Sequence, residues 1–203
     1  EHSIPTLHGW PEASAPEHLS PTEVELVLAS CNETSEIGIR NNAILLFLAR
    51  LGLRASDVVG LRLDDMDWPD ASFIVSGKAS REVRLPLPQE VGDALLNYLP
   101  HRPDANTDKV FVRHKAPLGP LTAESVSMIA TAAMERVGVK TKSRGAHLLR
   151  HTAATHMLRQ GVPLSQIGAV LRHRSQDMTA HYAKVDFDLL QEVVQRWPEN
   201  TSC

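Results

Sequence analysis

The sequence predicts an α+β fold that is mostly α-helical and carries a small antiparallel three-stranded sheet. Apolar residues recur at helical spacing over most of the chain. A short middle region instead has the short β-branched runs that favour strands. Glycines stand where the helical patterns stop, at Gly52, Gly138 and Gly161. Helical spacing over most of the chain, interrupted by one region with strand-forming residues, predicts the α+β class.

Each expected element has a local reason. Ser20 caps the first helix, with Pro21 at its first position and Glu23 completing a capping box. Strands are expected at 72–75 and 82–87 around a turn at 77–80, and 65–68 is expected to add a third strand. Further helices are expected at about 37–51, 56–61, 88–99, 123–137, 146–160, 164–171 and 176–184. Tyr98 lies in an apolar helix and is expected in the core.

The chain divides into three regions. Residues 1–19 are rich in Pro, Glu, His and Ser without periodicity and are expected to be an arm or linker. Residues 20–186 are expected to form the folded domain. Residues 187–203 are expected to be a tail with a helical apolar stripe. This tail could pack on its own domain or dock on a neighbouring protomer.

The charge is unevenly distributed. The net charge of −3 argues against a nucleic-acid partner, but residues 136–176 hold eight Lys or Arg and no acid. Residues 1–40 hold seven Glu against Arg40 alone. We therefore expect an anion-binding surface within 136–176, although single cations there could merely solvate helix faces.

The remaining composition narrows the function classes. No apolar run reaches the roughly 18 residues of a membrane span, and no secretory signal pattern begins the chain. Neither Cys31 nor Cys203 has metal-ligand spacing. We expect a reduced cytoplasmic protein without a membrane span.

A first candidate functional residue is Arg54, which follows the helix stop at Gly52. A guanidinium held on a tight turn can bind two oxygens of one phosphate. The alternative is a surface salt bridge between Arg54 and Asp57.

A second group lies on one predicted helix. His147 and Arg150 are three residues apart, so their side chains are neighbours on the helix surface. His147 and His151 have the spacing of two zinc ligands. However, Leu148 stands where a zinc hydrolase helix has its glutamate, and the sequence offers no evident third ligand.

A third group surrounds a short helix near the chain end. The segment Leu171-Arg172-His173-Arg174-Ser175 precedes Tyr182, one of two tyrosines. A lone tyrosine there is usually packing, so it becomes a chemical candidate only if it shares a pocket with the arginines and histidines.

These residues and their order resemble the catalytic domain of the tyrosine recombinase family, which includes phage integrases and Xer-type recombinases. The resemblance covers about residues 18–186. The matching motifs are the Gly-Leu-Arg motif, the Gly-Lys turn before the second strand, the His-x-x-Arg motif and the Leu-x-His motif, with the tyrosine nine residues later. The resemblance implies six catalytic residues: Arg54, Lys78, His147, Arg150, His173 and Tyr182.

This sequence departs from the family pattern at three places. Arg172 replaces the usual Gly before the late His, and Ala79 replaces the second Gly of the Gly-Lys-Gly turn, with Arg81 nearby as a substitute for Lys78. Family members usually carry a separate helical core-binding domain ahead of this one, and we expect at most a short arm of it here.

The resemblance implies strand cleavage and rejoining of double-stranded DNA through a 3′-phosphotyrosyl intermediate, without metal, ATP or another cofactor. It also implies a homotetramer on synapsed DNA and a monomer when free. Expected further DNA contacts are Lys140, Lys142, Arg144, Arg172 and Arg174. The alternatives are DNA relaxation of the type IB topoisomerase kind, an inactive DNA-binding fragment, and a zinc hydrolase.

Overall fold

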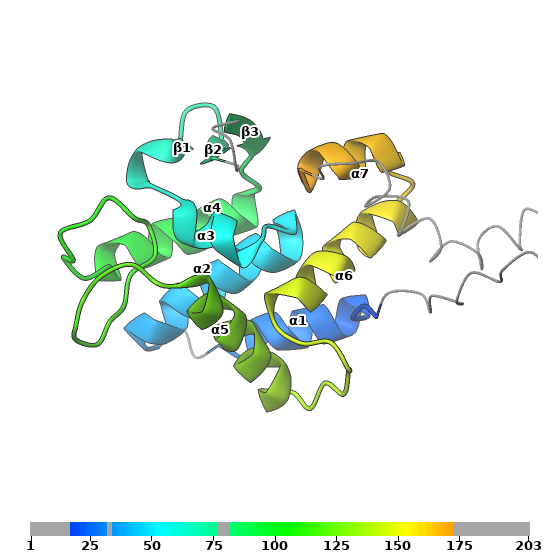
Figure 1. Cartoon of the computed structure of the whole chain (residues 1–203), viewed down its shortest axis with the longest axis horizontal. Helices are drawn as coiled ribbons and strands as arrows, with labels where there is room; N and C mark the ends of the chain where they lie inside the picture. The colour runs from blue at the N-terminus through cyan, green and yellow to red at the C-terminus, as the bar shows by residue number, and fades with distance from the viewer. Residues whose placement is uncertain (1–16, 32–33, 77–81, 173–203) are drawn as a thin grey trace, which may run out of the picture.

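The computed structural model describes residues 17–31, 34–76 and 82–172 (Figure 1). The predicted α+β class is confirmed. The elements in chain order are α1 (Pro21–Ala29), α2 (Glu36–Leu51), α3 (Ala55–Gly60), the 3₁₀ helix η1 (Leu63–Asp65), β1 (Met66–Asp67), β2 (Ser72–Ser76), β3 (Glu82–Pro86), α4 (Gln89–Tyr98), the 3₁₀ helix η2 (Leu99–His101), α5 (Ala123–Arg136), α6 (Ala146–Arg159) and α7 (Leu164–Val170).

Helix α1 begins as predicted. The Ser20 hydroxyl accepts a hydrogen bond from the Glu23 amide, and the Glu23 carboxylate accepts one from the Ser20 amide. These reciprocal bonds satisfy two backbone donors at the helix start. They also lower the pKa of the Glu23 carboxyl, first through the bond from the Ser20 amide.

Helix α2 is the centre of the fold. It contacts α1, α3, α4, α5 and α6, and most of its side chains are buried. Phe47 packs edge-on against Phe73 from the sheet and Phe111 from the following segment. Tyr98 stacks on Phe111 and is fully buried, which confirms its predicted place in the core. Its hydroxyl accepts a hydrogen bond from the Val112 amide.

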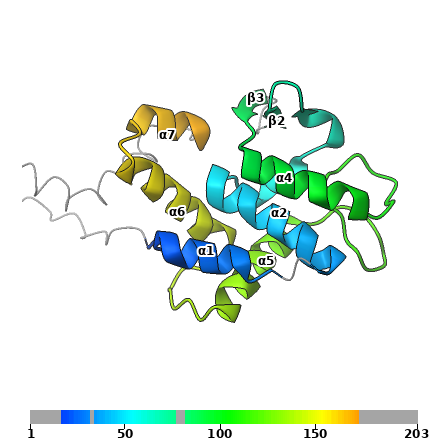
Figure 2. The same ribbon diagram turned by 180° about the vertical axis from the view of Figure 1, so that it is seen from behind.

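The three-stranded sheet is antiparallel, in the order β1-β2-β3. The register pairs Phe73 with Leu85 and Ser76 with Glu82, and 66–67 adds the expected third strand. The sheet lies at one edge of the molecule, opposite α1 and α5 (Figures 1 and 2). The expected turn at 77–80, with Lys78, lies outside the described residues.

The segment from 102 to 122 has no helical or strand pattern, and specific polar bonds hold it instead. The Arg102 guanidinium donates to the backbone carbonyls of Thr107, Lys109 and Val110. Because these bonds connect residues without a shared periodicity, the sequence pattern did not predict this arrangement. The two 3₁₀ helices were also not predicted.

The predicted helix stops at Gly138 and Gly161 are confirmed, since both adopt the left-handed conformation just after α5 and α6. The helix expected at 176–184 and the tail from 187 lie outside the described residues. None of the helices in the described part of the chain has both the length and the apolar character of a membrane span.

Gly52 makes the closest junction of the fold. It ends α2 in the left-handed conformation, with φ of 61°. A Cβ atom here would lie 2.6 Å from Leu171 Cδ2 and 3.3 Å from the Ala153 Cβ. Glycine is therefore required both for its backbone angle and for the approach of α6 and of the residue after α7.

We predict that Gly52→Ala lowers the free energy of unfolding by about 2 kcal/mol, because it adds backbone strain and a clash. Urea denaturation of the purified chain measures this. Gly60→Ala is the matched control, since a Cβ there meets nothing within 4 Å. It should stabilise α3 by roughly 0.5 kcal/mol. Equal stability of the two variants would contradict the prediction.

Candidate functional site

Arg54 is held at the start of α3. Its amide donates to Asp57 Oδ2 at 3.0 Å, and its side chain is 36% exposed. One guanidinium nitrogen, Nη2, donates to the backbone carbonyl of Arg172 at 3.1 Å. The tight turn after Gly52 therefore fixes the Arg54 backbone, while the Arg172 carbonyl fixes its guanidinium.

Asp57 is the buried anion of this region. Its carboxylate lies 3.9 Å from Arg54 Nη1, so the salt bridge considered as the alternative role of Arg54 is present but long. The same carboxylate oxygen makes a closer ion pair with Arg172 Nη2, and both side chains are nearly fully buried. Asp57 therefore neutralises Arg172 more than Arg54.

Arg150 lies inside the protein on α6 and is 6% exposed. Its Nη1 donates to the Gly52 carbonyl at 2.5 Å, and its Nη2 donates to the Leu171 carbonyl. A guanidinium that is removed from water must have its donors satisfied. Arg150 thus joins the end of α2 to the residue after α7.

Leu171 and Arg172 form a turn directly after α7, here called the 171–172 turn. Its two consecutive carbonyls accept hydrogen bonds from Arg150 and Arg54, which are 96 residues apart in the sequence. Arg172 has a positive φ of 53°, a backbone angle that favours glycine. The turn brings two predicted phosphate-binding arginines together.

His147 lies in the first turn of α6, one helical turn before Arg150, and its side chain is exposed. Its Nε2 is 2.6 Å from His151 Nε2, and the two rings are perpendicular. Partial burial, with a smaller effect of Arg150, lowers the pKa of His147 below its ordinary value. His147 is therefore suited to accept a proton near neutral pH.

The pair of His147 and His151 also bears on the zinc alternative. Two imidazoles this close could share a metal, but a zinc site needs at least a third protein ligand. Across the described segments, no group of three His, Cys, Asp or Glu side chains is arranged to hold a metal ion. The geometry therefore does not favour that alternative.

The start of α6 is buried against α5, and Ala146 is only 5% exposed. Gly145 precedes the helix and provides no side-chain cap. The Ala146 amide instead donates to the Ser127 hydroxyl of α5 at 3.4 Å, so part of this helix start already has a partner within the protein. The preceding loop exposes Lys140, Lys142 and Arg144, although Arg144 is also 2.9 Å from the Glu135 carboxylate. Their expected DNA contacts remain predictions.

Arg172 is placed differently from these three residues. It was expected to contact DNA, but its guanidinium is only 9% exposed and is paired with Asp57. A DNA contact would require that ion pair to open. The geometry instead favours a positioning role for Arg172, through Asp57 and through its own carbonyl.

The described residues include three of the six predicted catalytic residues: Arg54, His147 and Arg150. Lys78, His173 and Tyr182 lie outside the described residues, as does Arg174. The pairing of Asp57 with both Arg54 and Arg172, and the hydrogen bond from Arg150 to the Leu171 carbonyl, were not predicted from the sequence. Spacing alone showed Asp57 near Arg54, but no sequence signal links Asp57 to Arg172.

Comparison with known proteins identifies the family. The model of the phage integrase family matches residues 17–188. The putative integrase/recombinase y4rA of Sinorhizobium fredii is 40% identical over 97% of this chain, which spans 48% of that relative. The putative integrase/recombinase y4gC of the same organism is 34% identical, and the match covers 90% of this chain and 96% of y4gC. The tyrosine recombinase XerC of Syntrophus aciditrophicus is 30% identical, over 91% of this chain and 62% of XerC.

Solved structures share the fold. XerH recombinase bound to palindromic difH substrate superposes with a TM-score of 0.77 at 23% identity, over 91% of this chain and 54% of XerH. XerA recombinase also gives 0.77 at 22% identity, over 93% of this chain and 67% of XerA. The chain spans about half the length of y4rA. The chain belongs to the phage integrase family, and its fold is that of a tyrosine recombinase catalytic domain.

Proposed function

We propose that this chain is the catalytic domain of a site-specific DNA recombinase that cleaves and rejoins DNA through Tyr182. The observation that carries this proposal is the 171–172 turn. Its carbonyls hold Arg54 and Arg150 together, and it directly precedes His173 in the segment that leads to Tyr182. Two guanidiniums fixed beside the expected nucleophile segment are the arrangement that phosphoryl transfer requires.

The proposed cleavage step uses the protein's own side chains. The Tyr182 hydroxyl attacks the scissile phosphorus, a bond forms between tyrosine oxygen and phosphorus, and the bond to the 5′-oxygen breaks. His147 accepts the tyrosine proton, and Lys78 donates a proton to the departing 5′-oxygen. Arg54, Arg150 and His173 stabilise the negative charge that develops on the phosphate oxygens.

Rejoining reverses this chemistry on another strand. The 5′-hydroxyl of that strand attacks the 3′-phosphotyrosyl link, and Tyr182 leaves with its proton restored. The covalent intermediate conserves the phosphodiester bond energy, so the proposed reaction needs neither ATP nor a metal ion.

The partner we propose is double-stranded DNA in the cytoplasm, associated with the nucleoid. Two supporting neighbours are XerH and the Tn1549 transposon integrase, which were both solved in complex with DNA. The exposed Lys140, Lys142 and Arg144 beside the α6 N-terminus would bind backbone phosphates. We further propose a homotetramer on synapsed DNA and a monomer in its absence.

We predict that Tyr182→Phe abolishes covalent adducts on a nicked suicide duplex from the host locus, because the attacking oxygen is removed. Denaturing gels that detect protein–DNA adducts measure this. Tyr98→Phe is the matched control, since Tyr98 is the other tyrosine of the chain and is buried in the core. Adducts formed by the Tyr182 variant would contradict the proposed nucleophile.

We predict that cleavage slows in acid with a midpoint below about 6.5, the ordinary histidine value. The pKa of His147 is lowered, so the imidazole stays neutral and able to accept a proton until the pH falls past that lowered value. Cleavage at limiting DNA, measured as kcat/KM against pH, reports the free protein. His147→Asn should remove this acid limb, whereas His156→Asn should keep it. If both variants lost cleavage rate at acid pH with the same midpoint, His147 would not be the group that accepts the proton.

We predict that Arg172→Met slows cleavage about tenfold, or about 1.4 kcal/mol. Without Arg172, the buried Asp57 carboxylate has Arg54 as its nearest described cation and would draw that guanidinium away from the phosphate. The double variant Asp57→Asn with Arg172→Met should recover most of the rate, because the competing charge is gone. Single-turnover cleavage measures both, and a double variant as slow as Arg172→Met would contradict the prediction.

A further inference from the structure

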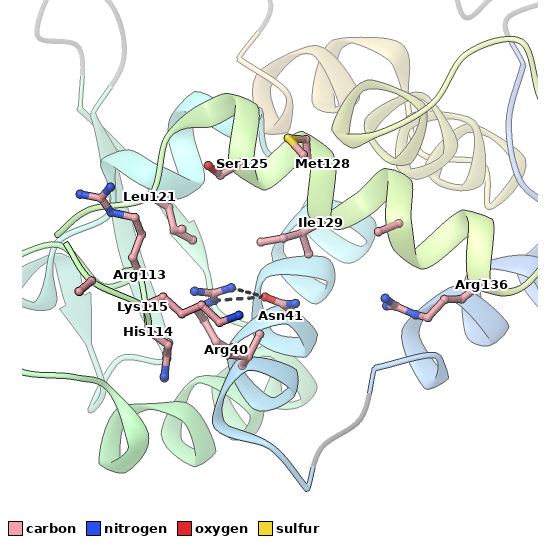
Figure 3. A pocket seen from close by; sticks show the side chains of 13 residues that line it. Arg40, Asn41, Arg113, His114, Lys115, Leu121, Ser125, Met128, Ile129 and Arg136 are labelled. Carbon is pink, nitrogen blue, oxygen red and sulfur yellow. Dashed lines mark hydrogen bonds between the residues drawn. The ribbon is translucent and has the colours of Figure 1, made fainter. Parts of the chain in front are cut away.

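A second cationic site lies between the first half of α2, helix α5 and the segment that precedes α5 (Figure 3). It is a pocket of about 470 Å³, and none of its lining residues is acidic. Arg40 lies about 12 residues before Gly52 on α2, which corresponds to roughly 18 Å along the helix. The pocket is therefore separate from the 171–172 turn and its arginines.

Arg40 is the buried charge of this pocket. It is 7% exposed, and its guanidinium donates to Asn41 Oδ1 through Nε and Nη2 and to the Val112 carbonyl through Nη1. No carboxylate in the described segments pairs with it. Burial lowers the pKa of Arg40, and the described acids do not offset this effect. A buried charge is usually paired with an opposite charge, so an anion in this pocket would provide the partner that the described residues do not.

The hydrogen-bond geometry of Arg40 shows what could complete it. A guanidinium has five N–H donors, and three are used. The remaining donors are one on Nη1 and one on Nη2. Two donors on neighbouring nitrogens match an acceptor group with two oxygens, such as a carboxylate or a phosphate.

His114 provides an independent observation. Its side chain is 3% exposed and lines the same pocket, and within the described chain neither ring nitrogen has a hydrogen-bond partner. Its Nδ1 lies 3.4 Å from Glu36 Oε2, but that contact does not have hydrogen-bond geometry. Burial, and to a smaller extent Arg40, lower the pKa of His114 although the Glu36 carboxylate opposes them, which favours the neutral ring with one N–H.

The wall of the pocket beside Arg40 is apolar and favours a ligand that has an apolar portion. Leu121, Met128 and Ile129 line the wall near Arg40, and Figure 3 shows Leu121 and Ile129 extending into the space above the guanidinium. Lys115 and Arg113 lie on the preceding segment and Arg136 on α5, which adds positive charge around the opening. A volume of about 470 Å³ is within the range of small-molecule sites.

We propose that this pocket binds a small organic anion, with its carboxylate or phosphate head on Arg40 and its apolar body against Leu121, Met128 and Ile129. The pocket is separate from the 171–172 turn, where the DNA phosphate is proposed to bind, and its wall of Leu121, Met128 and Ile129 suits an organic ligand rather than a sugar-phosphate backbone. The inference does not depend on the proposed recombinase activity, since binding can be measured without DNA.

The test titrates the full 203-residue chain with 4-phenylbutyrate and with phenyl phosphate, by calorimetry and thermal shift. We expect at least one of them to bind with a Kd below about 1 mM, a modest affinity for a ligand of this size. Inorganic phosphate supplies the head alone and 4-phenylbutanol supplies the body alone. Each should bind at least tenfold more weakly than the better amphipathic anion. Comparison of the two anions identifies which head group is preferred.

The variants place opposite charges at one exposed position. Met128 lines the pocket and is 66% exposed, so its replacement should leave the fold intact. Met128→Glu should weaken anion binding about tenfold, and Met128→Lys should preserve or strengthen it. Arg40→Met removes the deep charge but keeps an apolar stem, and it should abolish measurable binding.

Several outcomes would overturn the proposal. Neither anion binding below about 1 mM, or equal binding of the neutral alcohol, would show that Arg40 does not select an anion. Inorganic phosphate binding as tightly as the amphipathic anions would show that the apolar wall is not used. Equal affinity of the two Met128 variants would place the ligand elsewhere on the protein.

Discussion

The buried guanidinium of Arg150 is the interaction on which the rest of this structure depends. It has left water, so its donors must be satisfied inside the protein, and the carbonyls of Gly52 and Leu171 do this. Those carbonyls reach it only because Gly52 has no Cβ to separate α2 from Leu171. The same approach places the Arg172 carbonyl within reach of Arg54. One buried cation therefore fixes three chain segments and, through them, the second arginine.

The arginines of this region differ in how closely a carboxylate pairs with them. Arg172 is paired with the buried Asp57 carboxylate, whereas Arg150 donates to the Gly52 and Leu171 carbonyls and Arg54 has Asp57 at a longer distance. Because Asp57 pairs more closely with Arg172, the Arg54 guanidinium is the more available of these two arginines to a phosphate. The pocket around Arg40 follows the same rule at the other end of α2, where a carbonyl and an amide satisfy part of a buried guanidinium. In both places neutral acceptors position the cation without cancelling its charge.

The basic residues between 136 and 176, a stretch without acids, do not all lie on one exposed surface, as the composition alone suggested. Arg150 and Arg172 from this stretch lie inside the protein, where they organise the 171–172 turn. Lys140 and Lys142 are exposed beside the start of α6, but Arg144 also meets Glu135 from the preceding helix. The Glu17 carboxylate accepts hydrogen bonds from the backbone of the same loop. Charge counted along the chain therefore overstates the free positive surface, because folding supplies acids from neighbouring segments.

The sequence by itself determined the α-helices of the described residues, their glycine stops, the capping box of α1 and the small sheet, because these depend on local spacing and backbone preference. It also determined the candidate residues Arg54, His147 and Arg150 through motif order. Only the tertiary structure decided how these arginines are held, since Asp57, Gly52 and the 171–172 turn meet across about a hundred residues without any shared period. The pocket at Arg40 was likewise invisible in the sequence. Its unpaired charge exists only because α2, α5 and the segment before α5 exclude water from a side chain that would be ordinary on a surface.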